Sequence, residues 1–357
     1  MYINDLLKGS FLKRLYASYS VPHFVGPPGI GKTSIVEQFC ADQELGYVPF
    51  HLTSVDAPDV RGFTYPTKSE GGPVTLFTKS PLLTLVERTG LDSGIIFLDE
   101  FGQCEHATAK AVAPMLSERR LGNEEVPEGW RVWLASNRQQ DRAGVLRMLS
   151  HNQNRVMEIP LESDQESWVT WATAHGLHPL FISFARHRPG IIFTNEVPEK
   201  PGPYCTPRSY VRAEEFLTVG MKNKLHGDLP LDPVSSEAVG GLISAAVAAE
   251  LFAHFAVKEL LPEADEIVSA PKRAKVPPES RLDAQYAAMQ LALYIVNRKN
   301  TDAVATYLMR LNRELQTSAI VQLIRKLGGA MLNAPSLAAW ASDPANHALV
   351  AESLNVS

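Results

Sequence analysis

Residues 26–34 combine glycines, a lysine and hydroxyl side chains at a spacing that can bind phosphate. The segment satisfies G-x-x-x-x-G-K-[ST] between an apolar run and a predicted helix. The glycines let backbone N–H groups turn inward around phosphates, and the helix N-terminus adds partial positive charge. We expect Lys32 to reach the β- and γ-phosphates and the Thr33 hydroxyl to ligate Mg²⁺. The predicted nucleotide-binding residues are Gly26, Pro27, Pro28, Gly29, Ile30, Gly31, Lys32, Thr33 and Ser34.

Two carboxylates follow a second apolar run further along the chain. Residues 95–98 are Ile-Ile-Phe-Leu, and Asp99 and Glu100 come next. Ligands of open α/β sheets bind outside the carboxyl ends of the strands. We therefore expect Asp99 to hold Mg²⁺ through its water shell and Glu100 to orient and polarise the attacking water, while the cation offsets the repulsion between the carboxylates. Because Asp-Glu after a strand is also a common loop start, this prediction depends on the phosphate-binding loop upstream.

Asn137 directly follows a third, largely apolar run, residues 133–136. If that strand lies between the phosphate-loop strand and the acidic strand, Asn137 can reach the γ-phosphate or the attacking water. Asparagine is also a frequent turn residue after strands. The expected position favours the functional role.

Alternating strands and helices must position these residues. From about residue 20 to residue 160, short apolar runs alternate with amphipathic stretches, which predicts an α/β fold with a parallel sheet flanked by helices. The expected strands are 21–25, 46–52, 94–98, 131–135 and 156–161. The expected helices of this region are 34–42 and 107–118.

The chain after residue 161 is predicted to be helical. Helices are expected over 166–175, 178–187, 208–219, 235–257, 284–296 and 302–315, with a Pro/Gly-rich loop over 188–207. Four prolines and mixed charge in 262–279 indicate a linker. The predicted domains are an α/β nucleotide-binding core (1–161), an all-helical lid (162–261), a linker (262–279) and a C-terminal helical extension (280–357).

Bulk composition narrows the class of protein. The 357 residues are 45% apolar and 20% charged, which is ordinary for a globular protein of two or three domains. No membrane span or signal peptide is expected. The three widely spaced cysteines, Cys40, Cys104 and Cys205, argue against a disulfide framework and favour a cytoplasmic location. A net charge of −5 makes nucleic acid an unexpected partner.

The order of these motifs resembles that of the AAA+ superfamily of P-loop ATPases. Walker A corresponds to 26–33, Walker B to 95–100 and sensor 1 to Asn137. The finer resemblance is to MoxR-type AAA+ ATPases. The segments that carry it are 56–63, 135–145, 168–179, 188–189 and 206–210. The resemblance covers roughly residues 20 to 260 and leaves 265–357 uncovered.

The resemblance also assigns two arginines to catalysis beside Glu100 and Asn137. Arg208 corresponds to sensor 2 at the start of a lid helix, where its charge would contact the γ-phosphate; an anionic ligand would explain a cation at a helix start. The alternative is a surface arginine held by its neighbouring proline. Arg155 corresponds to the arginine finger, which stabilises transition-state charge in a neighbouring subunit, with Arg142 and Arg147 as alternatives.

The function implied by the resemblance is ATP binding and Mg²⁺-dependent ATP hydrolysis by a homo-oligomeric ring, usually a hexamer. Such a chaperone-like ring would remodel a protein client or complex, with a von Willebrand factor A domain protein as adaptor. Phe63 or Tyr65 could grip a client, or could pack onto their own domain. One alternative is a nucleic-acid-dependent motor of the McrB-like branch, whose Asn and Asp-Arg pattern recurs here. Another alternative is a nucleotide-gated interaction switch.

Overall fold

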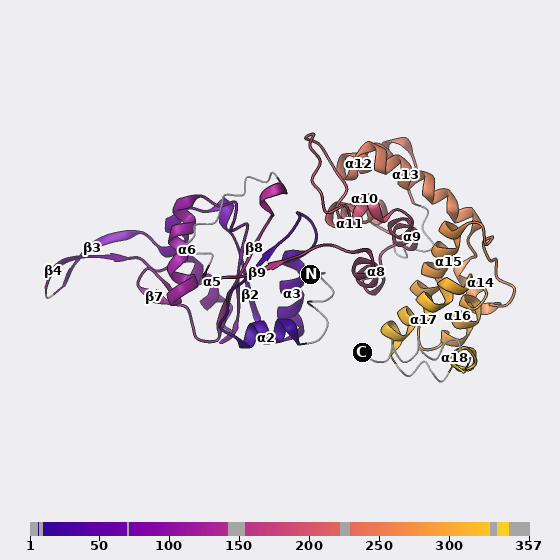
Figure 1. Cartoon of the computed structure of the whole chain (residues 1–357), viewed down its shortest axis with the longest axis horizontal. Helices are drawn as coiled ribbons and strands as arrows, with labels where there is room; N and C mark the ends of the chain where they lie inside the picture. The colour runs from indigo at the N-terminus through magenta and orange to yellow at the C-terminus, as the bar shows by residue number, and fades with distance from the viewer. Residues whose placement is uncertain are drawn as a thin grey trace. The chain divides into compact units, whose positions relative to one another are not determined.

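The computed structural model describes residue 6 and residues 10–69, 71–141, 154–221, 229–328 and 334–342, and it divides into two compact units. The core unit comprises Met1–Asp164 and Asn195–Glu199. The helical unit comprises Gln165–Thr194 and Lys200–Ser357. Figure 1 shows strands in the first unit and helices throughout the second.

A five-stranded parallel sheet forms the centre of the core unit. Its strand order is β2-β5-β8-β1-β9. The strands are β1 (Pro22–Val25), β2 (Gly46–His51), β5 (Gly94–Asp99), β8 (Trp130–Ser136) and β9 (Met157–Pro160). The predicted α/β class and the predicted strands are thereby confirmed. β8 lies between β1 and β5, as expected for the strand that ends before Asn137.

Helices cover both faces of this sheet because successive strand side chains point to opposite sides. Ile95 and Phe97 of β5 join a core with two helices, while Ile96 and Leu98 join a second core with others. The stacked rings of Phe39 and Trp133, 5.6 Å apart, belong to the first core. The first core contains α2 (Phe11–Ala17) and α3 (Lys32–Asp42), and the second contains α4 (Ala57–Arg61), α5 (Pro81–Arg88) and α6 (His106–Glu118).

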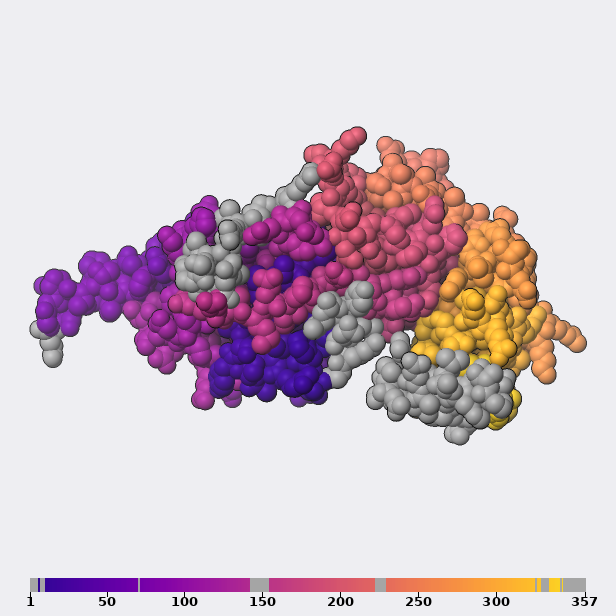
Figure 2. All heavy atoms as spheres, viewed as in Figure 1, coloured from indigo at the N-terminus to yellow at the C-terminus, as the bar shows by residue number. Residues whose placement is uncertain are grey.

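A two-stranded hairpin extends from the core unit between α4 and α5, and it was not predicted. β3 (Thr64–Ser69) pairs antiparallel with β4 (Gly72–Phe77), and both are largely exposed. Figures 1 and 2 show it as an arm of this unit. The base of the arm is anchored because the Thr78 N–H donates to the Phe63 carbonyl at 2.7 Å. A shorter hairpin pairs β6 (Arg120–Leu121) with β7 (Glu124–Glu125).

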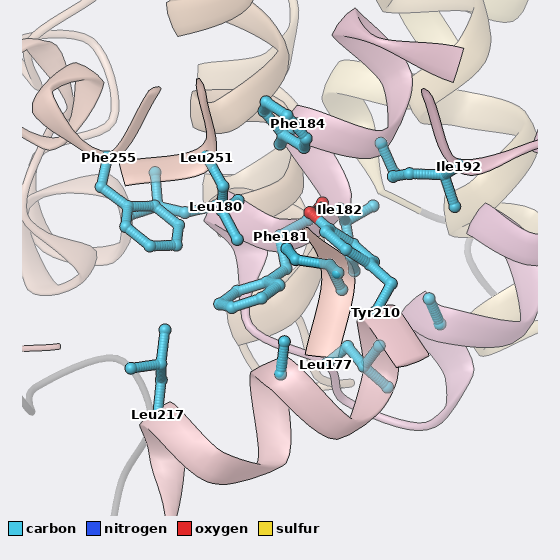
Figure 3. Packing of buried hydrophobic residues seen from close by; sticks show 14 of the residues in the cluster. Leu177, Leu180, Phe181, Ile182, Phe184, Ile192, Tyr210, Leu217, Leu251 and Phe255 are labelled. Atoms are coloured by element: carbon cyan, nitrogen blue, oxygen red, sulfur yellow. Dashed lines mark hydrogen bonds between the residues drawn. The ribbon is translucent and has the colours of Figure 1, made fainter. Parts of the chain in front are cut away.

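The helical unit begins with a core of aromatic and aliphatic side chains (Figure 3). Phe181 lies 5.3 Å, ring to ring, from both Tyr210 and Phe255, and the Tyr210 hydroxyl donates to the Phe181 carbonyl at 2.8 Å. This pairing satisfies a buried polar group inside an apolar core. The surrounding helices are α8 (Gln165–Ala174), α9 (Pro179–His187), α10 (Pro189–Ile192), α11 (Pro207–Thr218), α12 (Pro233–Ile243), α13 (Ala245–Phe255) and η3 (Ala256–Leu260).

The C-terminal helices build a second core in the same unit. Ile267 and Ala274, from the predicted linker, are buried in it. Its helices are α14 (Ala264–Ser269), α15 (Leu282–Ile295), α16 (Thr301–Leu308), α17 (Arg313–Leu327) and α18 (Pro335–Ala341). No helix among the described residues is long and apolar enough to cross a membrane. The division of the chain into core, lid, linker and extension stays a prediction.

Two expected helices are interrupted. The stretch 235–257 breaks at Ser244, whose φ of 80° ends α12 and whose hydroxyl accepts from the Val247 N–H as the N-cap of α13. The stretch 302–315 breaks after Leu308, and α17 starts at Arg313 behind an Asn312 cap. In both places a side-chain cap competes with helix continuation.

Candidate functional site

The predicted phosphate-binding loop connects β1 to α3. Gly29 and Gly31 have φ values of 76° and 103°, a region that glycine enters without steric cost. The Gly26 N–H donates to the Ser136 carbonyl at 3.3 Å, which ties the start of the loop to β8. A Cβ atom at Gly26 would lie 2.6 Å from the Leu161 carbonyl oxygen. Three of the motif glycines are therefore required by backbone geometry.

Lys32 lies at the start of α3 and is buried. Its Nζ donates to the carbonyls of Gly26 and Pro27 at 2.8 and 2.9 Å, and to Asn137 Oδ1 at 2.9 Å. The ammonium therefore links the loop to the end of β8. A phosphate oxygen presented to the loop would meet a positive charge that is already oriented by the protein.

Thr33 and Asp99, the two residues predicted to bind the cation, lie side by side. The Thr33 hydroxyl donates to Asp99 Oδ2 at 2.8 Å, and His51 Nδ1 lies 4.0 Å from the same oxygen. A hydroxyl and a carboxylate are hard oxygen ligands of the kind Mg²⁺ takes beside phosphate and water. The two residues predicted to serve the metal are therefore in contact.

Glu100 is half-buried and adopts φ 59°, the left-handed region that is uncommon for a side chain of this size. Its backbone N–H donates to Asp99 Oδ1 at 2.9 Å. Its Oε2 accepts a short hydrogen bond from the Thr53 hydroxyl. Strain of this kind concentrates at functional sites, where the surroundings hold it in place.

Thr53 was missed by the sequence analysis. It lies in η1 (Leu52–Ser54), directly after β2, and His51 of β2 is paired with Asp99 of β5. Neighbouring parallel strands bring their following residues to the same sheet edge. The polar residue after β2 was the signal that could have found it.

Asn137 directly follows β8, and β8 flanks β5 on the side opposite to β2. Its Oδ1 accepts from Lys32, and its backbone N–H donates weakly to Gln103 Oε1 at 3.4 Å. Asn137 and Glu100 thus follow adjacent strands of the sheet. This arrangement brings Lys32, Thr33, Asp99, Glu100 and Asn137 to one edge.

A buried histidine contacts the end of β8 next to that edge. His23 Nε2 lies 2.6 Å from the Ser136 hydroxyl, one residue before Asn137. Burial, followed by the charge of Lys32, lowers the pKa of His23 from 6.5 to about 4. The imidazole is therefore neutral near pH 7.

The predicted arginines are not all described. Arg155 is exposed just before β9 in the core unit, and Arg208 is exposed in the first turn of α11 in the helical unit. The side chains of Thr206 and Ser209 form a capping box at this helix start. Arg142 and Arg147 lie outside the described residues. The roles of all four remain predictions.

Comparison with known proteins gives one family match over this part of the chain. Residues 23–150 match the family model of the AAA domain, dynein-related subfamily. No match was found among curated proteins. Similar solved structures include NtrX from Brucella abortus, with 15% identity, a TM-score of 0.39, and coverage of 99% of this chain and 68% of that one. They also include NtrX in complex with ADP, with 15% identity, a TM-score of 0.37, and coverage of 97% and 68%.

The matched segment 23–150 contains the phosphate-binding loop, both carboxylates and Asn137. These residues therefore lie in the part of the chain that matches the AAA domain, and the parallel sheet with flanking helices is consistent with the AAA+ fold. AAA domains are in general nucleotide-binding ATPases.

Proposed function

We propose that this protein is a MoxR-type AAA+ ATPase that binds ATP with Mg²⁺ and hydrolyses it. The observation that carries the proposal is the convergence of Lys32, Thr33, Asp99, Glu100 and Asn137 at one edge of the sheet. These are the side chains that phosphoryl transfer to water needs: a cation near the phosphates, metal ligands, a carboxylate for the water and a polar sensor.

Each side chain has a separate part in the proposed reaction. Lys32 stabilises negative charge on the β- and γ-phosphates. Thr33 and Asp99 would hold Mg²⁺, which neutralises charge on the phosphate oxygens when bound. Glu100 orients the attacking water and polarises its O–H bond, and Asn137 positions the γ-phosphate or that water. Because Asn137 Oδ1 accepts from Lys32 Nζ, both side chains would lie near the same phosphate.

We further propose that the protein acts as a ring and that two arginines act on nucleotide in that ring. Arg155, with Arg142 and Arg147 as alternatives, would act on the nucleotide of a neighbouring subunit, and Arg208 would act as sensor 2. Arg155 is exposed, as a residue that reaches another subunit must be. The proposed assembly is a hexamer in the cytoplasm that remodels a protein client, with a von Willebrand factor A domain adaptor.

The test is ATP turnover of wild type and Glu100→Gln, with particle mass recorded with and without ATP. We expect turnover to fall at least about a hundredfold, since the water loses its oriented carboxylate, while ATP binding persists. Glu105→Gln is the matched control: this exposed carboxylate precedes α6 and caps nothing with its side chain, so turnover should stay unchanged. Full turnover in Glu100→Gln would contradict the assigned role.

Particle mass and added polymers separate the remaining possibilities. A ring that forms or tightens with ATP in Glu100→Gln supports the motor. A monomer under all conditions, without turnover, contradicts ring-driven remodelling unless a partner restores activity. Turnover that rises with DNA and falls steeply with salt would favour a nucleic-acid motor instead.

A further inference from the structure

The chain leaves the core unit and re-enters it close to the proposed site. It crosses between the units after Asp164, after Thr194 and after Glu199. The short segment Asn195–Glu199 is therefore a part of the core unit that lies between two stretches of the helical unit. Any change in the core that moves this segment acts directly on the chain leading into the helices.

Asn195 ties the exit and re-entry points together. Its Oδ1 accepts from the Ser163 N–H at 3.0 Å and from the Ser163 hydroxyl at 2.9 Å, and its Nδ2 donates to the Ser163 carbonyl at 3.1 Å. Ser163 is buried. Asn195 adopts φ 53°, a left-handed conformation that asparagine tolerates better than most residues. The two crossings at 164 and 194 are thus joined within the core.

Arg138 connects this tie to the nucleotide site. Its Nη2 donates a short hydrogen bond to the Asn195 carbonyl, and it directly follows Asn137. Asp141 fixes the guanidinium, accepting from Nη2 at 2.7 Å and from Nε at 3.1 Å, and it also accepts from the Arg138 N–H at 2.9 Å. The Asp141 side chain is only 1% exposed and the Arg138 side chain 21%, so the carboxylate is shielded from water and its several hydrogen bonds hold the guanidinium in one geometry.

A second link joins the phosphate-binding loop to the exit segment, residues 161–164, through which the chain leaves the core unit. Leu161 lies two residues before Ser163, and its N–H donates to the Val25 carbonyl at 2.7 Å. Its own carbonyl closes over Gly26, where a Cβ atom would lie 2.6 Å away. The exit segment is therefore held between the start of the phosphate-binding loop and the Arg138–Asn195 tie.

We propose that Arg138 is a positioning residue that transmits the phosphate state sensed at Asn137 to the helical unit through Asn195. When Asn137 exchanges its contact with Lys32 for a phosphate or water, the next residue shifts with it. Arg138 then moves the Asn195 carbonyl, because the rigid fork held by Asp141 cannot swing independently. The inference rests on the proposed function and adds a regulatory route to the same site.

The test is hydrogen–deuterium exchange of the full chain with and without a non-hydrolysable ATP analogue, beside a direct measurement of analogue Kd. In wild type we expect the analogue to slow exchange in residues 165–218. In Arg138→Met that slowing should fall by about fivefold or more, the size of a modest allosteric coupling. The analogue Kd should stay within about threefold, because Lys32 and Thr33 are untouched.

Arg131→Met is the matched control. Arg131 lies at the opposite end of β8 and donates to the carbonyls of Tyr16 and Glu128 at 2.9 and 2.7 Å, so its loss also removes hydrogen bonds to backbone carbonyls. Its loss should leave the nucleotide-dependent slowing intact. Asn195→Gly keeps the left-handed backbone and the carbonyl that Arg138 contacts but removes the bonds to Ser163, and should reduce the slowing in part.

The outcomes separate the inference from the proposed function. Full slowing in Arg138→Met, or equal loss in Arg131→Met, would overturn the positioning role. Wild type that binds the analogue without any change in the helical unit would also overturn it, while leaving the ATPase proposal standing. Wild type that binds no analogue would overturn the proposed function and this inference with it.

Discussion

The buried His23 should make the core unit sensitive to acid. Its Nε2 contacts the Ser136 hydroxyl, no described residue forms a hydrogen bond with its Nδ1, and its pKa is lowered to about 4 by burial and then by Lys32. The folded protein therefore binds fewer protons at this site than the unfolded chain between pH 6.5 and pH 4. The contribution of His23 to the unfolding free energy is therefore complete above the unfolded pKa, and it falls as the pH decreases through that window.

The magnitude follows from the two pKa values. The difference between 6.5 and about 4 corresponds to about 3 kcal/mol, at about 1.4 kcal/mol for each pKa unit, fully lost below the folded pKa. At pH 5 the loss should already reach about 2 kcal/mol relative to pH 7.5, because the unfolded chain is then almost fully protonated at this residue. That is a large part of the stability of an ordinary domain.

The assay is urea unfolding of wild type and His23→Gln at pH 7.5 and pH 5. Glutamine keeps a polar partner for Ser136 but does not titrate, so the variant should lose about 2 kcal/mol less than wild type between the two pH values. His254, whose pKa burial also lowers to about 4, titrates in both proteins and cancels in the difference. Equal losses of unfolding free energy in the two proteins would refute the reasoning, because the pKa of His23 would then be the same in the folded and unfolded states.

Three further predictions concern the loop, the carboxylate proposed to orient water and the helical core. Gly26→Ala places a Cβ atom 2.6 Å from a backbone carbonyl, so it should lower the unfolding free energy of the protein by about 1–3 kcal/mol and weaken ATP binding. Gly71→Ala is the control, because a Cβ atom there has nothing within 4 Å, and it should change neither property. Urea unfolding and nucleotide titration of the two variants check this. Thr53→Val frees Oε2 of Glu100 for water and should raise turnover about fivefold, equivalent to about 1 kcal/mol, in a steady-state assay; unchanged turnover would argue against competition for that oxygen. Tyr210→Phe removes the hydrogen bond that the buried hydroxyl donates to the Phe181 carbonyl and should lower the unfolding free energy by about 1 kcal/mol, with no change in ATP affinity.

Contiguous motifs made the arrangement of the proposed nucleotide site predictable. Residues 26–34 carry their own conformation, since glycines at 29 and 31 permit the left-handed turns that the loop uses. Asp99, Glu100 and Asn137 each follow an apolar run, and parallel strands bring such ends to one edge. The expected place of β8 between β1 and β5 is confirmed, so the pairing of Asn137 with the loop followed from strand order.

Other elements gave weaker local signals. The β3–β4 hairpin exposes Tyr65, Val74 and Leu76, so its strands lack the buried face on which alternation is normally recognised. Apolar periodicity continues through Ser244, where a single serine cap divides one expected helix into two. Propensity cannot settle such a break, because packing of both halves into the same core decides it.

The sequence by itself determined the fold class, the phosphate-binding loop and the carboxylates, because each depends on residue types at short, fixed spacings. Only the tertiary structure decided that Thr53 contacts Glu100, that His23 supports Ser136, and that Arg138 holds Asn195. These partners are separated along the chain by distances that no local pattern spans. Strand register sets which side chains meet, and burial, which arises from the whole core, sets the pKa of His23.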